Sequence, residues 1–369
     1  MRNPKGYLPR QHSEKMKIIK KILEAIACNY HRLFLSVLVI AGLASFFIAP
    51  NVGFRDRGNN MGGSGWLKRS YASLRYYLGD TLFDVTLAAR SHWFVYIGEK
   101  SLDDYQNTQP YSPQDIAYIQ DNLDRLSGFL TSNGIDFIVI IPPNKNTIYP
   151  QYMPSQIPII GSQSRLDQLI AYEKDHGTFK VMDLRSDLLE AGKKYQTYYS
   201  CGTHWNDYGA FIAYRDLMTS LEKDYPRLAP RGLNEYRMVD GLGDVGLMDL
   251  AHLDHSACSG INLVPLFKRQ VVIGQSTIPT GDTANDFTSP LEITTLNADS
   301  SLPRLLMYRD SFATALIPFL SDNFSQAVYM NSYYKDELYS DVALEKPDVV
   351  IVEFTERYFD YMIKVMFKI

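Results

Sequence analysis

The sequence lacks a surplus of basic residues. Its 369 residues include 37 Lys and Arg against 41 Asp and Glu, which gives a formal net charge of −4 at pH 7. This balance offers no basic surface on the scale that phosphate backbones require, so nucleic acid is excluded as the main partner. The sequence also shows no internal repeat and no coenzyme-binding motif. We therefore expect no bound cofactor.

Cysteine is scarce, with three residues in all: Cys28, Cys201 and Cys258. Cys28 precedes a long apolar run, whereas the other two follow it and would face an oxidising compartment if that run crosses a membrane. A Cys201–Cys258 bridge would tie the irregular 225–265 segment to the chain just before His204. Two unpaired thiols fit the sequence equally well, so the pairing stays open.

The long apolar run extends from Leu33 to Ala49. It is long enough to cross a bilayer, and the positive-inside rule keeps the basic segment 1–32 in the cytoplasm. No small-x-small cleavage site follows the run, which argues against a signal peptide. We expect an uncleaved single-pass anchor in the inner or cytoplasmic membrane, with the main domain periplasmic or extracellular. Residues 50–65 are glycine-rich and polar, and predict a flexible linker.

Residues 66–369 alternate between helical patterns and short apolar runs of the kind that form buried strands. Ser112 and Pro113 are typical of a helix start. Residues 225–300 interrupt the alternation and predict an insertion with a small antiparallel element. The rest predicts an α/β fold with a doubly wound parallel sheet, whose ligands bind at the carboxyl ends of its strands. Strands are expected at 135–141, 179–184, 305–308, 327–330 and 348–354, and helices near 163–174, 186–192, 207–223 and from 311.

Ser311 and His204 are the residues best placed for chemistry. Ser311 stands where the apolar strand Leu305 to Tyr308 turns into an expected helix. A serine there exposes its hydroxyl, and its backbone N–H lies near a helix N-terminus, which favours a developing oxyanion. A plain N-cap serine is the structural alternative. His204 also follows an expected strand and precedes a helix, so both side chains would project from the same edge of the sheet.

Four short motifs occur along the chain in one order. They are "IPPNKNTIYPQYMP" at Ile141 to Pro154, "THW" at Thr203 to Trp205, "RDSF" at Arg309 to Phe312 and "VVIVEFTERYF" at Val349 to Phe359. From about Ser91 onward the chain resembles the SGNH-type O-acetyltransferases of exopolysaccharide assembly, namely the AlgJ and AlgX alginate acetylation proteins and their relatives. The resemblance implies an SGNH-hydrolase-like fold, and the expected anchor is closer to AlgJ than to AlgX.

The resemblance implies that Ser311 is the nucleophile and His204 the general base. The triad aspartate of the family's D-T-H-W motif falls on Gly202, and the motif glycine before Asp310 falls on Arg309. A triad acid fixes the imidazole tautomer and stabilises the imidazolium, and Gly202 can do neither with a side chain. Another acceptor could replace it, the enzyme could work slowly as a dyad, or the chain could have lost catalysis.

Other residues near this expected site have a functional and a structural interpretation. Asn144 and Lys145 follow a strand end, from which an amide or ammonium could complete an oxyanion hole or could stabilise a loop. Asp310 is expected to brace the nucleophile turn, and Asp207 to point along its helix, away from the His204 ring. Trp205 could form a wall for a sugar ring or could pack internally.

A second group, Asp249, His252, Asp254 and His255, has the residue types of a metal site. It lacks an H-E-x-x-H frame and lies in turn-rich sequence, so we interpret it as a solvated loop and predict no metal.

The resemblance implies that the protein O-acetylates an extracellular polysaccharide through a serine acyl-enzyme. It also implies a membrane-bound O-acyltransferase partner that delivers the acetyl group across the bilayer, because acetyl-CoA is cytoplasmic. Two alternatives stay open. One is an acetyl esterase that uses the same Ser/His pair. The other is a catalytically degenerate polysaccharide-binding or scaffold subunit of an acetylation complex, for which Gly202 and Arg309 are the best support.

Overall fold

The computed structural model describes residues 62–241, 243–255, 258–277, 292–331 and 338–366. The chain forms two compact units, Met1–Lys68 and Arg69–Ile369, and the second contains the α/β domain. The expected anchor, Leu33 to Ala49, lies outside the described residues. Within the described ranges, no helix is both long and apolar enough to span a bilayer.

Helix α2 (Gly62–Tyr77) begins inside the segment expected to be a flexible linker up to residue 65. The linker prediction is therefore wrong for its last four positions, 62–65. Glycine adopts helical dihedrals as well as others, so glycine content alone does not place the start of a helix.

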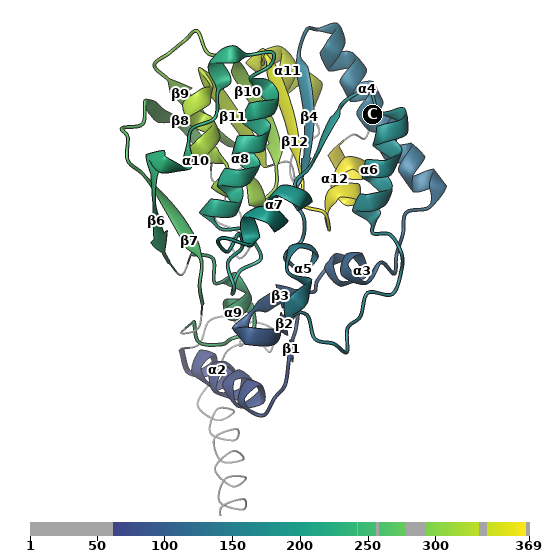
Figure 1. Cartoon of the computed structure of the whole chain (residues 1–369), viewed down its shortest axis with the longest axis vertical. Helices are drawn as coiled ribbons and strands as arrows, with labels where there is room; N and C mark the ends of the chain where they lie inside the picture. The colour runs from purple at the N-terminus through teal and green to yellow at the C-terminus, as the bar shows by residue number, and fades with distance from the viewer. Residues whose placement is uncertain (1–61, 242, 256–257, 278–291, 332–337, 367–369) are drawn as a thin grey trace, which may run out of the picture. The chain divides into compact units, whose positions relative to one another are not determined.

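Seven strands form one mixed sheet in the order β5-β4-β12-β10-β11-β9-β8 (Figure 1). Its five parallel strands are β4 (Asp136–Ile141), β5 (Lys180–Asp183), β10 (Arg304–Arg309), β11 (Gln326–Asn331) and β12 (Val349–Glu353). They coincide with the predicted strands. Strand β9 (Glu292–Asn297) pairs antiparallel with β11, and β8 (Val271–Thr277) pairs antiparallel with β9.

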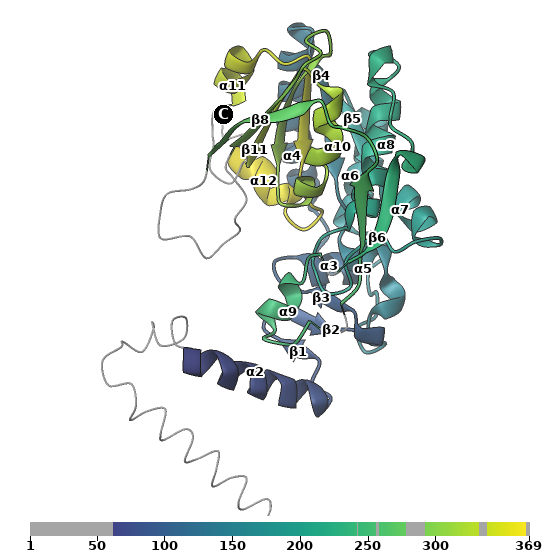
Figure 2. The ribbon, with the colours of Figure 1, turned by 90° about the vertical axis from the view of Figure 1, so that its left-hand side faces the viewer.

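Helices cover both faces of this sheet, as the doubly wound prediction requires. Figure 2 views the sheet towards its β8 edge, with α10 and α8 on one side and α12 and α11 on the other. On β10, Leu305 and Met307 lie in one core. Leu306 and Tyr308 alternate with them and lie in the other. The first core is covered by α5 (Lys145–Ile148), α7 (Arg185–Gly192), α8 (Asp207–Leu221) and α10 (Ile317–Leu320). The second is covered by α4 (Pro113–Ser132), α6 (Arg165–His176), α11 (Leu338–Glu345) and α12 (Phe359–Met366).

The prediction of an all-parallel sheet is wrong because of the 225–300 segment. Strands β6 (Tyr236–Asp240) and β7 (Ile261–Pro265) do form a separate antiparallel pair. Strands β8 and β9, however, extend the main sheet. An alternating pattern indicates a strand with two unlike faces but does not identify its neighbour, so the sequence could not show that β9 pairs with β11.

A small antiparallel sheet of β1 (Leu82–Phe83), β2 (Thr86–Ala88) and β3 (Phe94–Tyr96) was not predicted. It lies near α5, which follows the carboxyl end of β4 (Figure 1). The backbone N–H of Phe94 donates to Ser200 O over 2.8 Å, which connects this sheet to the segment before His204. Helices α3 (Ser101–Gln106) and α9 (Gly246–Leu250) also lie in this region.

Candidate active site

Three side chains from separate segments form one hydrogen-bonded series. His204 Nε2 lies 2.8 Å from Ser311 Oγ, and His204 Nδ1 lies 2.6 Å from Asp244 Oδ2. Both distances are in hydrogen-bond range, and a serine, histidine and carboxylate in this order have the arrangement of a catalytic triad. The structure thus brings together the two residues singled out from the sequence and adds an acid that sequence reasoning missed.

Ser311 lies in a turn directly after β10, and Asp310 holds this turn. Asp310 is buried, and its Oδ1 accepts the backbone N–H of Phe312 over 2.8 Å. Its Oδ2 accepts the N–H of Thr355 over 2.7 Å and the Thr355 hydroxyl over 2.5 Å. Thr355 follows β12, the neighbour of β10 in the sheet. Asp310 therefore fastens the serine turn to the end of the adjacent strand.

The helix expected from Ser311 onward is shorter than predicted. A 3-10 turn, η6 (Phe312–Ala315), comes first, and the single α-helical turn α10 follows it. Pro318 is at the start of α10, where it lacks the N–H that would continue a helix from upstream. The helix-dipole argument for Ser311 consequently loses its basis, although the N–H of Ser311 still lies in the turn.

Trp205 is fully buried, which excludes the suggested role as a wall for a sugar ring. Its indole Nε1 donates to Phe312 O over 2.9 Å, and the two rings pack edge to face with centroids 5.4 Å apart. The Phe312 ring also lies 4.9 Å from the His204 ring. Trp205 therefore packs under the serine turn and joins it to the histidine segment.

His204 lies in a loop, and the strand expected before it is wrong. The loop is closed by an isolated bridge between Tyr198 and Trp205 and by the N–H of Asn206, which donates to Thr197 O over 2.9 Å. Helix α8 then begins with the Asn206 side chain capping the N–H of Gly209 over 3.0 Å. A Cβ at Gly209 would lie 2.2 Å from Thr197 O, so glycine permits this close approach.

Asp244 reaches the site from the 225–300 insertion, between β6 and α9. Its Oδ2 also accepts the backbone N–H groups of Thr203 (3.0 Å) and His204 (3.3 Å), and its Oδ1 accepts that of Gly246 (2.8 Å). Burial raises the pKa of Asp244, but the hydrogen bond and charge of His204, with the backbone donors, outweigh burial and hold the pKa well below its ordinary value. The carboxylate is therefore ionised at neutral pH.

The family motif places the orienting acid at position 202, where this chain has glycine. Gly202 allows Asp244, from a distant segment, to take that role. A Cβ at Gly202 would lie 2.3 Å from Asp244 Cγ. Side chains cannot approach this closely, so the Asp244 carboxylate occupies space that only a glycine at 202 leaves open. The orienting acid is present, but it comes from another segment.

Glycine also shapes the chain that carries Asp244. Gly243 has a φ of +51°, a backbone conformation that favours glycine, and it lies against the Tyr199 ring. A Cβ there would come within 1.9 Å of Tyr199 Cε1. The stretch "GLGDVG" at 241–246 was therefore a signal that could have identified Asp244 as a candidate acid, because it places an acid among glycines in a turn-rich insertion.

The Cys201–Cys258 disulfide is present, with the two Cα atoms 5.3 Å apart. It joins the segment before His204 to the insertion, and Leu247 N donates to Cys201 O over 3.1 Å beside it. Of the two possibilities that the sequence left open, the structure has the bonded one. The bridge brings the Asp244 segment next to His204.

Asn144 does not point its amide at Ser311. It is buried, its Nδ2 donates to Asp104 Oδ2 over 3.3 Å, and its Oδ1 accepts from Arg357 Nη1 over 3.1 Å. Lys145 Nζ donates to backbone carbonyls of residues 199–202, the segment just before His204, which we call the histidine loop. The oxyanion roles suggested for both residues are therefore unsupported, because their donors are committed to other acceptors. Both residues stabilise loops.

Two more polar residues brace the surroundings of the site. Asp207 Oδ2 accepts the N–H of Leu263 over 2.9 Å, so this acid holds β7 and does not reach the His204 ring. Arg309 is fully buried, and its Nη1 donates to Asp310 O over 3.2 Å. Burial lowers the pKa of Arg309, and the charges of Glu353 and Asp310 oppose that shift. Arg309 thus packs at the base of the serine turn.

The second candidate cluster has no metal-binding geometry in the structure. His255 Nε2 and Asp249 Oδ1 form an exposed hydrogen bond of 2.8 Å. Across the residues that the structure places, no group of three or more His, Cys, Asp or Glu side chains could hold a metal ion.

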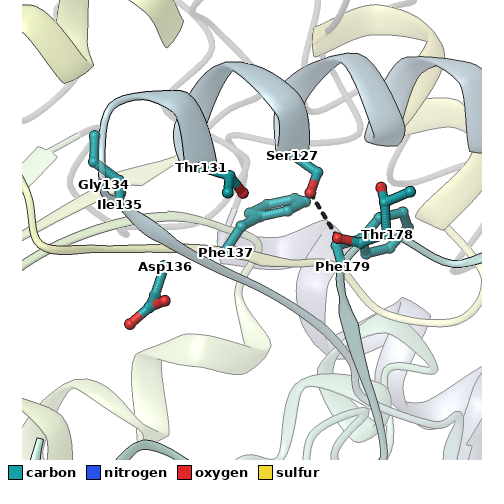
Figure 3. A pocket seen from close by; sticks show the side chains of 8 residues that line it. All are labelled: Ser127, Thr131, Gly134, Ile135, Asp136, Phe137, Thr178 and Phe179. Atoms are coloured by element: carbon teal, nitrogen blue, oxygen red, sulfur yellow. Dashed lines mark hydrogen bonds between the residues drawn. The ribbon is translucent and has the colours of Figure 1, made fainter. Parts of the chain in front are cut away.

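A pocket lies between the end of α4 and the amino ends of β4 and β5 (Figure 3). Ser311 follows the carboxyl end of β10, which runs in the same direction as β4, so the pocket is at the opposite end of the strands. Ser127 Oγ donates to Thr178 O over 3.0 Å at its edge, and Asp136 points away from α4. This pocket contains no nucleophile and base in contact, so it is no second active site.

Comparison with solved structures gives further context. PatB1 of Bacillus cereus superimposes with a TM-score of 0.55 at 16% identity, and covers 74% of this chain and 97% of its own. A DHHW family protein of Eubacterium siraeum gives a TM-score of 0.54 at 13% identity, and covers 77% of this chain and 96% of its own. The O-acetyltransferase domain of Pseudomonas putida AlgJ gives 0.43 at 18% identity, with coverage of 74% and 92%.

Sequence comparison identifies the family. No curated protein matches the chain. The family model for the SGNH hydrolase-like domain of the acetyltransferase AlgX matches residues 89–282, more than half of the sequence. This range includes His204 and Asp244 and ends before Ser311. The chain therefore belongs to the AlgX family of SGNH hydrolase-like acetyltransferases.

Proposed function

We propose that the protein transfers acetyl groups to hydroxyls of an extracellular polysaccharide through an acyl-enzyme on Ser311. The observation that carries the proposal is the hydrogen-bonded series Ser311–His204–Asp244, in a chain that belongs to an acetyltransferase family. The series also weakens the argument for a degenerate scaffold subunit, which rested on the missing acid at Gly202 and on Arg309.

The geometry supports a two-step mechanism. Asp244 accepts the Nδ1–H of His204, which leaves Nε2 unprotonated and facing Ser311 Oγ. In the first step Nε2 takes the Ser311 proton as Oγ attacks the acetyl carbonyl, and it then protonates the departing group. In the second step Nε2 takes the proton of a sugar hydroxyl. The sugar oxygen then attacks the acetyl-serine, and the proton returns to Ser311.

The location that we propose is outside the cytoplasm, with the domain tethered by the Leu33–Ala49 anchor. The Cys201–Cys258 disulfide supports this location, because such bonds persist in oxidising compartments. Acetyl-CoA is cytoplasmic, so a membrane-bound O-acyltransferase is the proposed source of the acetyl group. The identity of the polysaccharide is not part of the proposal.

The test is Ser311→Ala, with Ser155→Ala at an exposed serine as the control. We expect Ser311→Ala to abolish polymer acetylation in cells and ester cleavage in vitro, and to remove the acetyl adduct that mass spectrometry should find on the Ser311 peptide. The control should behave like wild type. Unchanged activity in Ser311→Ala would overturn the proposal.

The same three residues would make an esterase if water, not sugar, resolved the acyl-enzyme. The discriminating measurement is how the acyl-enzyme divides between water and sugar. If the protein is a transferase, adding an oligosaccharide acceptor to the ester assay should produce acetylated sugar and reduce the amount of free acetate. Release of acetate alone, at every acceptor concentration and with every glycan tried, would favour the esterase.

A further inference from the structure

Lys145 places a buried ammonium beneath the histidine loop. The residue follows β4 as the first residue of α5, and its side chain is 4% exposed. Its Nζ donates to three backbone carbonyls: Tyr199 O at 3.0 Å, Ser200 O at 3.2 Å and Gly202 O at 2.5 Å. An ammonium has three protons, so these three acceptors use all of them.

This charge is costly to bury, and no carboxylate among the described residues lies within ion-pair distance of it. The Trp93 ring is near, with its centroid 5.6 Å from Nζ. Burial lowers the pKa of Lys145 to about 7, while the negative charge of Asp244 and the three carbonyl acceptors favour the charged form. An apolar side chain at this position would avoid the cost of burying a charge, but it would remove the donor from the loop carbonyls.

The carbonyls of the loop point in two directions. Those of Tyr199, Ser200 and Gly202 converge on Lys145. The carbonyl of Cys201 instead accepts Leu247 N, in the segment that carries Asp244. Without the ammonium, the carbonyls of Tyr199 and Gly202 would lose this donor, and that of Ser200 would keep only the N–H of Phe94. The loop conformation that presents the next two residues, Thr203 and His204, therefore depends on Lys145.

We propose that Lys145 is a positioning residue of the active site. Its ammonium holds the Tyr199–Gly202 loop in the conformation that lets the N–H groups of Thr203 and His204 meet Asp244 while the ring of His204 faces Ser311. Lys145 touches neither the substrate nor the reacting atoms. The inference rests on the proposed acyl transfer and adds to it a residue that controls the geometry of the histidine.

The first test is Lys145→Met, which keeps the length of the side chain and removes its charge. We expect kcat for a model acetyl ester to fall about 100-fold with KM little changed, since a displacement of about 1 Å at a reacting group has that effect. We also expect the downfield proton NMR signal of His204 Nδ1–H, bonded to Asp244, to be lost or shifted. Lys193→Ala, at an exposed lysine, should change neither.

The second test is rescue of Lys145→Ala by a small cation. Ethylammonium, present during folding and assay, should restore at least one tenth of the lost kcat and the downfield signal, whereas propanol of similar size should restore neither. Melting curves with and without ethylammonium show whether the variant folds. Failure to fold without the cation and folding with it would also support the proposal.

Retention of wild-type kcat and of the downfield signal in Lys145→Met would overturn the inference. Equal rescue by propanol and ethylammonium would do so too, since volume alone would then account for the effect. Failure of the acyl-transfer proposal is separate, because it would appear as activity in Ser311→Ala. The His204 signal reports the geometry of the pair whichever reaction the site performs.

Discussion

Gly202 leaves the space that the Asp244 carboxylate fills, and that carboxylate orients His204 from 40 positions farther along the chain. The close approach of a Cβ at 202 to Asp244 makes this relation testable by substitution. It also answers what orients His204: the acid is Asp244, at 2.6 Å from Nδ1.

Gly202→Asp, although it restores the family motif, should lower kcat/KM by at least about 100-fold. The new side chain would meet Asp244 and leave a second buried carboxylate without a partner. The measurement is ester turnover by the purified variant. As the matched comparison, Gly202→Asp combined with Asp244→Gly removes the clash and should recover part of the activity. A faster single variant would contradict this account of the site.

Asp244→Asn should keep the shape of the acid but present the wrong group to His204 Nδ1. In serine proteases the corresponding change lowers kcat by about 10⁴-fold through the wrong tautomer, and we expect a loss of that order here. Asp240→Asn, on the exposed end of β6, is the control and should be neutral. Near-normal kcat in Asp244→Asn would show that another group orients the ring.

Glu356 provides a pH test of stability. Its Oε2 accepts from Asn144 N and Thr147 Oγ1, both over 2.8 Å. Burial, with the charge of Asp104, raises the pKa of Glu356 to about 7 from its ordinary 4.5. Because the folded-state pKa is the higher one, its contribution to stability is fully present below pH 4.5 and is lost as pH rises through about 7.

Glu356→Gln carries no charge at any pH, so its melting temperature should fall less than that of the wild type between pH 4.5 and pH 8. We expect the difference to be several degrees by calorimetry or circular dichroism. Identical pH dependence in the two proteins would mean that Glu356 titrates near its ordinary value.

At the scale of elements, the candidate active site lies where four connections meet at one end of the sheet. The turn after β10 carries Ser311, the loop before α8 carries His204, and the segment between β6 and α9 carries Asp244. The connection from β4 to α5 carries Lys145 beneath them. The disulfide joins two of these connections and so stabilises the position of the acid relative to the histidine.

Reduction of the Cys201–Cys258 bond should therefore lower both stability and activity. The cross-link spans 57 residues, and such bonds contribute about 2–4 kcal/mol by restricting the unfolded chain. The measurement is denaturant unfolding and ester turnover with and without reductant. The Cys201→Ser, Cys258→Ser double variant should match the reduced wild type and should not respond further to reductant.

At the scale of the whole molecule, we propose that the Leu33–Ala49 anchor tethers the α/β domain outside the cytoplasm. The expected anchor predicts that the full-length protein stays in the membrane fraction, with the chain beyond Pro50 open to external protease. A cytoplasmic protein in the same cells, protected until lysis, is the control. Recovery of a soluble form that begins near residue 50 would contradict the anchor.

The sequence by itself determined the α/β class, the five parallel strands, the position of Ser311 just after a strand and that of His204 just before a helix. These features follow from local patterns: apolar runs of strand length, capping residues and turn chemistry, which the chain carries within short windows. The helix from Ser311 and the strand before His204 were wrong because a proline and a tight loop overrode the pattern.

Only the tertiary structure decided that β8 and β9 join the main sheet, that Trp205 is buried and that Asp244 orients His204. Each of these depends on contacts between segments far apart in sequence. The glycine-rich stretch around Asp244 indicates a candidate acid, but its contact with His204 follows only from the packing of the whole chain. Gly202 shows the reason most clearly. In the sequence, Gly202 indicates a missing acid. In the structure, its lack of a side chain leaves the space through which Asp244, from another segment, reaches His204.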